Sequence, residues 1–270
     1  MKIGIITSGN EWLTLFKFLH KFNHNYYVYY DQNNRPYGDK DFDVSLRCIE
    51  KWVEYLQAQW IEKIIVSPVY ELYFLEKNKY VDIILPMFEN YMMNCVFANS
   101  LVWKIWFMWD FADVEVAQNL VYNLSKKYTL SDNQRKIKKF HFPFSFWVKE
   151  VQMWKYFGNN LSFSDFMLNK VIKFDLRYFK DSNVDSLVAL NYEYFNYQNT
   201  IYKFFNPKKQ KFHKINNLEK IFIDFDLSQD KDYSVNVCFN WHVEFLKREK
   251  KNLWNLQRGK AVDINFISIK

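Results

Sequence analysis

The chain has 270 residues, enough to bury one large hydrophobic core or two smaller ones. Its hydrophobic fraction of 49% and charged fraction of 25% are ordinary for a soluble globular protein. No run of about 18 apolar residues occurs, which excludes a predicted membrane-spanning helix. The first nine residues are too short and too strand-like for a secretory signal, so we expect a cytoplasmic protein.

A net charge of +7 raises the question of a nucleic-acid or membrane surface. Two lysine-rich clusters, at 208–211 and 247–251, are also typical of such a surface. No nucleic-acid-binding motif is present, however, and the aromatic residues are spread along the whole chain rather than gathered on one basic face. We therefore expect solvated lysines and no nucleic-acid partner. A basic interaction protein is the last-ranked hypothesis, and salt-dependent retention on DNA would support it.

The cysteines and histidines predict no metal site. Cys48, Cys95 and Cys238 are far apart and odd in number, which indicates buried, reduced thiols rather than a disulfide framework or a zinc site. Among five scattered histidines, only His20 and His24 share helical spacing. With no acidic third ligand evident, they are expected to form a surface pair.

Strand and helix patterns alternate along the chain. In chain order, the predicted strands are 2–7, 26–30, 63–66, 81–85, 103–109, 140–144, a strand around Leu187, 220–226 and 262–269. The predicted helices are 13–22, 44–59, a short one from about 71, 91–100, 114–127, 147–157, 164–181, 198–205 and 243–255. Polar connections are expected at 31–41 and 128–139. This alternation predicts an α/β fold with a mainly parallel sheet and flanking helices.

Polar residues follow two of these strands directly. The stretch 63–71 reads Lys-Ile-Ile-Val-Ser-Pro-Val-Tyr-Glu, in which β-branched residues make a short buried strand and Pro68 ends it. The stretch 186–195, Ser-Leu-Val-Ala-Leu-Asn-Tyr-Glu-Tyr-Phe, repeats the pattern. Ligands of open α/β folds bind just past the carboxyl ends of strands. These two strand ends are therefore the predicted ligand site.

Read together, these pieces resemble glutamate racemase and the wider Asp/Glu racemase superfamily over almost the whole chain. The opening 3–14, Ile-Gly-Ile-Ile-Thr-Ser-Gly-Asn-Glu-Trp-Leu-Thr, is similar to the family's Asp-Ser-Gly followed by Gly-Gly-Leu-Thr. Tyr30-Asp31 with Pro36-Tyr37-Gly38 and Lys40 resembles the family's substrate loop. Residues 60–66 and 184–188 resemble the strands that lead to the family's two cysteine motifs, and 104–109 resembles the strand that opens its second domain.

The resemblance implies two similar α/β domains, each with a mainly parallel sheet flanked by helices. The second domain, 99–206, is inserted into the first, 1–98 with 207–270. In that family one cysteine from each domain faces the substrate's α-carbon. One thiolate removes the α-proton, and the other thiol delivers a proton to the opposite face, with no cofactor.

Neither cysteine position of the family holds a cysteine here. Pro68 and Asn191 occupy them, and neither side chain exchanges a proton near neutral pH. Tyr70 and Glu193 follow within the two motifs, and Tyr192 directly follows Asn191. Thr7 replaces the acidic residue of the opening motif. By resemblance, the residues that remain to bind substrate are Ser8, Pro36, Tyr37, Gly38 and Tyr192.

The first hypothesis is a divergent racemase-like protein without two-cysteine racemase activity, which binds a small acidic or amino-acid ligand between the domains or serves a partner. A homodimer is compatible with it. The alternative is an active amino-acid racemase or isomerase in which Glu193 and Tyr70 form a relocated acid–base pair.

Glycine is scarce in this chain and tryptophan abundant, with 5 and 10 residues. Trp12, Trp60, Trp106 and Trp109, and also Trp241, fall where the resembled family prefers glycine. We hypothesise that the gene uses UGA for glycine and that these tryptophans arise from translation with another code. Trp12 is predicted to lie in a tight turn with positive φ, which disfavours tryptophan. UGG codons at these positions would refute the hypothesis.

Overall fold

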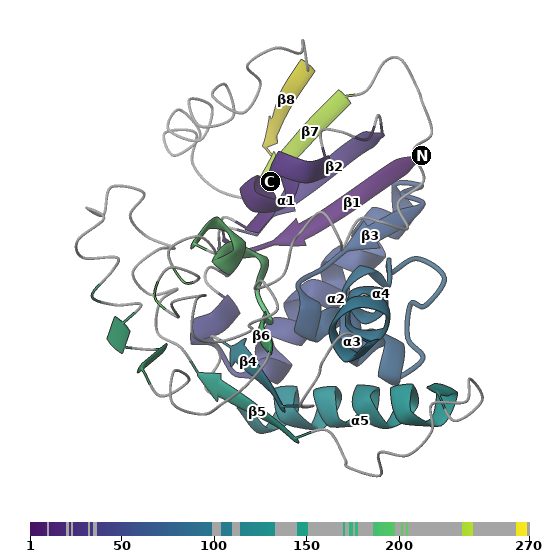
Figure 1. Cartoon of the computed structure of the whole chain (residues 1–270). Helices are drawn as coiled ribbons and strands as arrows, with labels where there is room; N and C mark the ends of the chain where they lie inside the picture. Colours follow the sequence, from purple (N-terminus) through teal and green to yellow (C-terminus); the bar gives the residue numbers. More distant parts are fainter. Residues whose placement is uncertain are drawn as a thin grey trace.

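The computed structural model describes residues 1–9, 11–19, 22, 24–31, 33–34, 37–98, 104–109, 114–132, 145–150, 170, 173–174, 176–177, 186–197, 201, 204, 234–239 and 263–268. In this part of the chain, the strands form two parallel sheets (Figure 1). The larger sheet has the order β3-β1-β2-β7-β8 and the smaller one the order β5-β4-β6.

The larger sheet joins strands from both ends of the chain. Its strands are β1 (Lys2–Thr7), β2 (Asn25–Tyr30), β3 (Lys63–Ile65), β7 (Ser234–Phe239) and β8 (Asp263–Ser268). The smaller sheet lies between them in the sequence, with β4 (Lys104–Trp109), β5 (Ser145–Glu150) and β6 (Ser186–Ala189). Parallel strands with helical crossovers confirm the α/β expectation.

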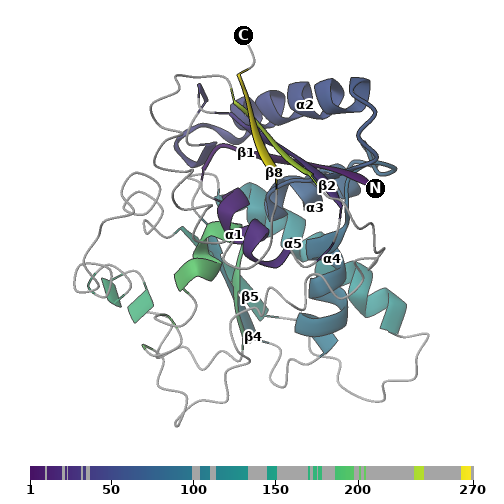
Figure 2. The same ribbon diagram turned by 90° about the horizontal axis from the view of Figure 1, so that it is seen from above.

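Helices cover both faces of the larger sheet. The described helices are α1 (Glu11–Leu19), α2 (Phe42–Ala58), α3 (Pro68–Glu76), α4 (Met87–Tyr91) with a π-helical continuation (Met92–Phe97), and α5 (Val114–Asp132). Figure 2 shows α2 on one face of the sheet and α1 on the other. Side chains of β2 alternate between these faces. Tyr26 packs edge-on against Phe16 of α1, at 5.8 Å between ring centroids, whereas Tyr29 lies 3.8 Å from the ring of Trp52 of α2.

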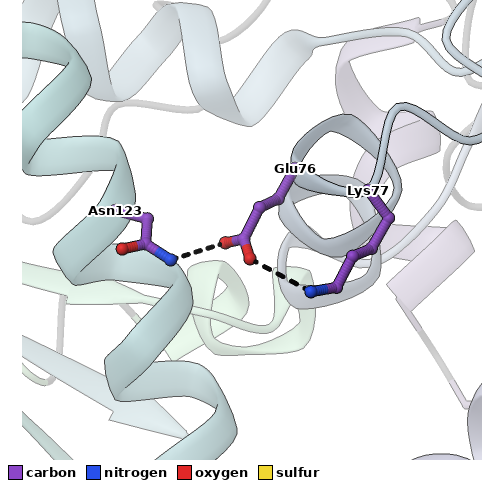
Figure 3. Close-up of polar contacts among 3 residues, drawn as sticks. All are labelled: Glu76, Lys77 and Asn123. Carbon is purple, nitrogen blue, oxygen red and sulfur yellow. Dashed lines mark hydrogen bonds and ion pairs between the residues drawn. The ribbon is translucent and has the colours of Figure 1, made fainter.

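Helix α3, which follows the larger sheet's β3, packs against α5, which follows β4 of the smaller sheet. Asn123 Nδ2 donates to Glu76 Oε2 at 3.1 Å, and Lys77 Nζ pairs with the other carboxylate oxygen at 3.5 Å (Figure 3). These exposed contacts contribute little stability. A pocket of about 250 Å³ lies beside them, lined by Leu72, Leu75, Glu76, Glu89, Leu120, Asn123, Leu124 and Lys127.

Several predicted elements differ from the structure. Residues 81–85 form a turn with one isolated bridge, Ile64 to Ile84, instead of a strand. Residues 147–150 belong to β5 instead of a helix, because pairing with β4 selects the extended form of a β-prone stretch. Strand β7 was not predicted, although buried Val235 and Val237 alternate around Asn236. Helix α5 continues to Asp132 through part of the expected connection. The predicted elements 140–144, 220–226 and 243–255 lie outside the described residues.

Two single-residue expectations are also wrong. Trp12 lies in α1 with helical backbone rather than in a turn of positive φ, and its ring is buried against Tyr30. His24 is buried beside Tyr26 rather than exposed, because the chain folds back there from α1 into β2, while His20 lies outside the described residues. Within the described ranges, none of the helices has the length and apolar character needed to cross a membrane.

Candidate active site between the two sheets

The two predicted strand ends meet at the carboxylate of Glu11. Glu11 is the first residue of α1 and is 8% exposed. Its Oε1 accepts a hydrogen bond from Ser67 Oγ at 2.9 Å and another from the Tyr192 N–H at 3.2 Å. Ser67 lies between β3 and α3, and Tyr192 begins the 3-10 helix Tyr192–Tyr197 after β6. One carboxylate thus joins the strand ends of both sheets.

Local sequence explains how each strand end is shaped. Pro68 is the first residue of α3, a position where its missing N–H costs no helical hydrogen bond. At the other strand end, Asn191 Oδ1 accepts from the Glu193 N–H at 2.7 Å, which is an Asx turn. The Glu193 carboxylate is 6% exposed and faces Gly9, where a Cβ would lie 3.7 Å from Oε2.

The predicted substrate loop is held by a buried aspartate. Ser8 Oγ accepts from the Tyr37 N–H at 2.9 Å. The Tyr37 hydroxyl donates to Asp31 Oδ2 at 2.8 Å, and Trp52 Nε1 donates to the same oxygen at 3.0 Å. Burial, followed by the charge of Asp31, raises the pKa of Tyr37 well above its usual value. Its hydroxyl therefore stays protonated and is committed to Asp31.

The remaining residues that the sequence predicts at the site are Pro36, Gly38 and Tyr70. Gly38 lies half-buried in the 3-10 helix Tyr37–Asp39, whereas Pro36 lies outside the described residues. Tyr70 is buried, with its ring stacked on Phe42 at 5.4 Å and edge-on to Tyr37 at 6.4 Å. Tyr70 therefore packs under the substrate loop.

A second buried carboxylate, Glu71, lies on the first turn of α3. It is 1% exposed, and its two oxygens accept from the backbone N–H groups of Phe88 at 3.0 Å and Glu89 at 2.8 Å. It thereby caps the start of α4. Burial raises the pKa of Glu71 to about 8, against the lowering effect of the two hydrogen bonds.

Tyr192 is fully buried near both carboxylates. Burial, then the negative charges of Glu71 and Glu11, raise the pKa of Tyr192 well above its usual value. Its hydroxyl makes no hydrogen bond to any described residue. A buried hydroxyl that finds no hydrogen-bond partner costs about 1–3 kcal/mol.

Glu11 and Glu71 were missed as site residues, although both stand in the stretches that the sequence singled out. The available signal was position: Glu11 lies in the first helical turn after β1, and Glu71 in the first turn after β3. Acidic residues in a first turn usually serve the helix dipole on the surface. Only the docking of the two sheets reveals their burial.

Comparisons with solved structures agree with this fold. No protein-family model matches the chain, and no curated protein matches it significantly. Solved structures do match. The glutamate racemase isoform from Bacillus anthracis has a TM-score of 0.74 at 12% identity, over 98% of this chain and 96% of that one. The Francisella tularensis glutamate racemase, solved with D-glutamate, has a TM-score of 0.68 at 14% identity, over 100% of this chain and 97% of that one. The Thermus thermophilus glutamate racemase, solved with β-chloro-D-alanine, has a TM-score of 0.69 at 14% identity, over 99% of this chain and 97% of that one.

The two parallel sheets and these structural matches show a two-domain α/β fold like that of the amino-acid racemases. More narrowly, the chain has the glutamate racemase fold along nearly its entire length, at low sequence identity. The predicted resemblance and fold class are confirmed. The domain boundaries at 98/99 and 206/207 stay a prediction.

Proposed function

We propose that the chain is a glutamate-racemase-like protein that does not carry out the two-cysteine reaction and that binds a small amino-acid or other acidic ligand between its domains. The carrying observation is the chemistry of the two strand ends. Pro68 has no titratable group, and the Asn191 amide oxygen is committed to an Asx turn. Similar structures hold D-glutamate or β-chloro-D-alanine, which supports an amino acid as the ligand class.

The chain's three cysteines offer no replacement. Cys48 lies in α2, Cys95 in the π-helical stretch and Cys238 in β7, so none follows β3 or β6. Burial raises the pKa of Cys48 and of Cys238. A raised pKa disfavours the thiolate, which is the form that abstracts a proton.

The first prediction is that the purified chain neither interconverts the enantiomers of glutamate or aspartate nor exchanges their α-protons. Proton NMR in heavy water measures the exchange, because exchange removes the α-proton signal, and the change in optical rotation measures the interconversion of the enantiomers. Isothermal titration of the same four amino acids tests ligand binding independently. Racemisation at a useful rate would refute the loss of activity, and failure to bind any of the four would leave only a scaffold role.

The alternative, a relocated acid–base pair, has support at one of its two residues. The Glu193 carboxylate lies at the junction of the sheets, whereas the Tyr70 ring is stacked on Phe42. Exchange that is present in the unchanged chain and lost in Glu193→Gln would establish this alternative. Tyr70→Phe is the matched control for the second residue.

We propose further that residue 60 is a glycine position. Trp60 lies two residues past the end of helix α2 with φ 59°, and the residue is 83% exposed. The Ile61 N–H donates to the Leu56 carbonyl at 3.2 Å and the Trp60 N–H to the Gln57 carbonyl at 3.0 Å, which is the Schellman motif that glycine usually completes. Trp52, by contrast, donates to Asp31 and packs on Tyr29. The left-handed backbone at Trp60 therefore supports UGA recoding at this position.

We expect Trp60→Gly to stabilise the chain by about 1 kcal/mol, because the left-handed conformation costs an L-residue about that much and no buried contact is lost. Chemical denaturation measures the change. Trp60→Asn should give a smaller gain and Trp60→Ala none, since asparagine tolerates positive φ better than alanine. Equal effects of all three would attribute the gain to loss of the exposed indole. The genomic codon for residue 60 tests the recoding itself, and UGG would exclude it.

A further inference from the structure

The hydrogen bonds at Glu11 describe a binding arrangement for a carboxylate. Two donors from different sheets, the Ser67 hydroxyl and the Tyr192 N–H, converge on one carboxylate oxygen. Ser67 is the residue before α3, yet its side chain makes no hydrogen bond to that helix. It is directed to Glu11 instead. Both donors lie at the strand ends where ligands of open α/β folds bind.

We infer that Ser67 and Tyr192 form a carboxylate-binding site that the chain fills with its own Glu11, and that an α-amino acid is the ligand that would displace it. The inference rests on the proposed function, which places a ligand between the domains. It adds a specific contact: the ligand's carboxylate takes the place of the Glu11 carboxylate, so Glu11 is an autoinhibitory residue.

The surroundings select an amino acid over a simple acid. Glu193 is buried at this junction and faces Gly9, two residues before Glu11. Buried carboxylates favour a nearby cation and repel a second anion. An α-amino acid offers its carboxylate to Ser67 and Tyr192 and its ammonium group to the buried Glu193, whereas acetate offers a carboxylate alone. The buried Tyr192 hydroxyl, which has no partner among the described residues, is a further group for a ligand to meet.

The partial exposure of Gly9, two residues before Glu11, and of Ser67, which donates to Glu11, favours access of a ligand once the Glu11 side chain is removed. Glu11→Ala leaves both donors in place and deletes the internal carboxylate. Glu11→Gln keeps a side chain of the same size and an acceptor oxygen, so it leaves the site filled and is the matched control.

The test is isothermal titration of the full chain and its variants with L-glutamate, glycine and acetate. We expect Glu11→Ala to bind L-glutamate and glycine about tenfold or more tightly than the unchanged chain or Glu11→Gln, because hydrogen bonds to a charged group become available. Acetate should gain less than either amino acid. Adding Ser67→Ala to Glu11→Ala should remove most of the gain, since one donor is lost.

Glu11→Asp is the second variant, in case Glu11→Ala does not fold. Its carboxylate is one methylene shorter, so it withdraws from the two donors and should give an intermediate gain. In either variant, the amide signal of Tyr192 should shift with bound amino acid in an NMR titration. Equal affinity in the variants and the unchanged chain overturns the inference. If all of them bind, the proposed ligand function survives without it; if none binds, both fail.

Discussion

The free energy of unfolding is expected to fall by about 3–4 kcal/mol as the pH rises from 5 to 8, through the Glu71 carboxyl. In the folded chain, burial raises the pKa of Glu71 to about 8, whereas an unfolded glutamate titrates at its ordinary value near 4.5. Between these values the folded state binds more protons than the unfolded state. The contribution is therefore fully present below the unfolded pKa and is lost as the pH rises toward 8.

Glu71→Gln removes the titrating group and should flatten the dependence across this window. Glutamine keeps one acceptor for the two backbone donors at Phe88 and Glu89, so the variant is expected to be less stable than the unchanged chain at pH 5 and comparable at pH 8. Urea denaturation at half-unit pH steps measures both profiles. Glu76→Gln, which removes a partly exposed carboxylate from the same helix, is the control. A Glu71→Gln profile as steep as that of the unchanged chain would place the pH dependence elsewhere.

This dependence bears on the candidate site because Glu71 raises the pKa of neighbouring Tyr192. Each negative charge added near the buried hydroxyl strengthens its neutral form. The linkage makes the folded chain most stable at a pH where Glu71 holds its proton. Binding and exchange measurements at the site are best made at more than one pH between 6 and 8.

The sequence predicted the strands whose own side chains favour extension. Ile3, Ile5 and Ile6 in β1, and Tyr26, Val28 and Tyr29 in β2, carry a β-branched or aromatic signal that needs no partner to be recognised. Strand β5 was mistaken for helix because its identity depends on pairing with β4, a strand some 40 residues earlier in the chain. Tertiary pairing of that kind is invisible to a local pattern.

The candidate site divides in the same way. Its location could be predicted, because ligand sites of parallel sheets follow strand ends. Its central contact could not. The two hydrogen bonds to Glu11 come from residues 56 and 181 positions away along the chain, and they exist only once the two sheets dock. A first-turn glutamate carries no local sign that it will be buried between them.

The second large effect is expected at Asp31, where Asp31→Ala should lower the free energy of unfolding by about 3–5 kcal/mol. Asp31 is fully buried and accepts from the Tyr37 hydroxyl, from Trp52 Nε1 and from the Asn34 backbone and side chain. Removing the carboxylate leaves these donors without an acceptor. The cost is that of burying unsatisfied polar groups, which exceeds the net worth of the bonds themselves.

The same substitution should disturb the substrate loop. Tyr37 reaches Ser8 through its backbone N–H and Asp31 through its hydroxyl, so loss of Asp31 frees one of the two attachments. Tyr37→Phe deletes one donor and leaves Asp31 its other partners, so it should cost only about 1 kcal/mol. Asp82→Ala, an exposed aspartate, is the matched control and should stay within about 0.5 kcal/mol of the unchanged chain. Urea denaturation ranks the three variants. Equal losses in Asp31→Ala and Tyr37→Phe would mean that the hydroxyl contact alone, and not the shared carboxylate, holds the loop.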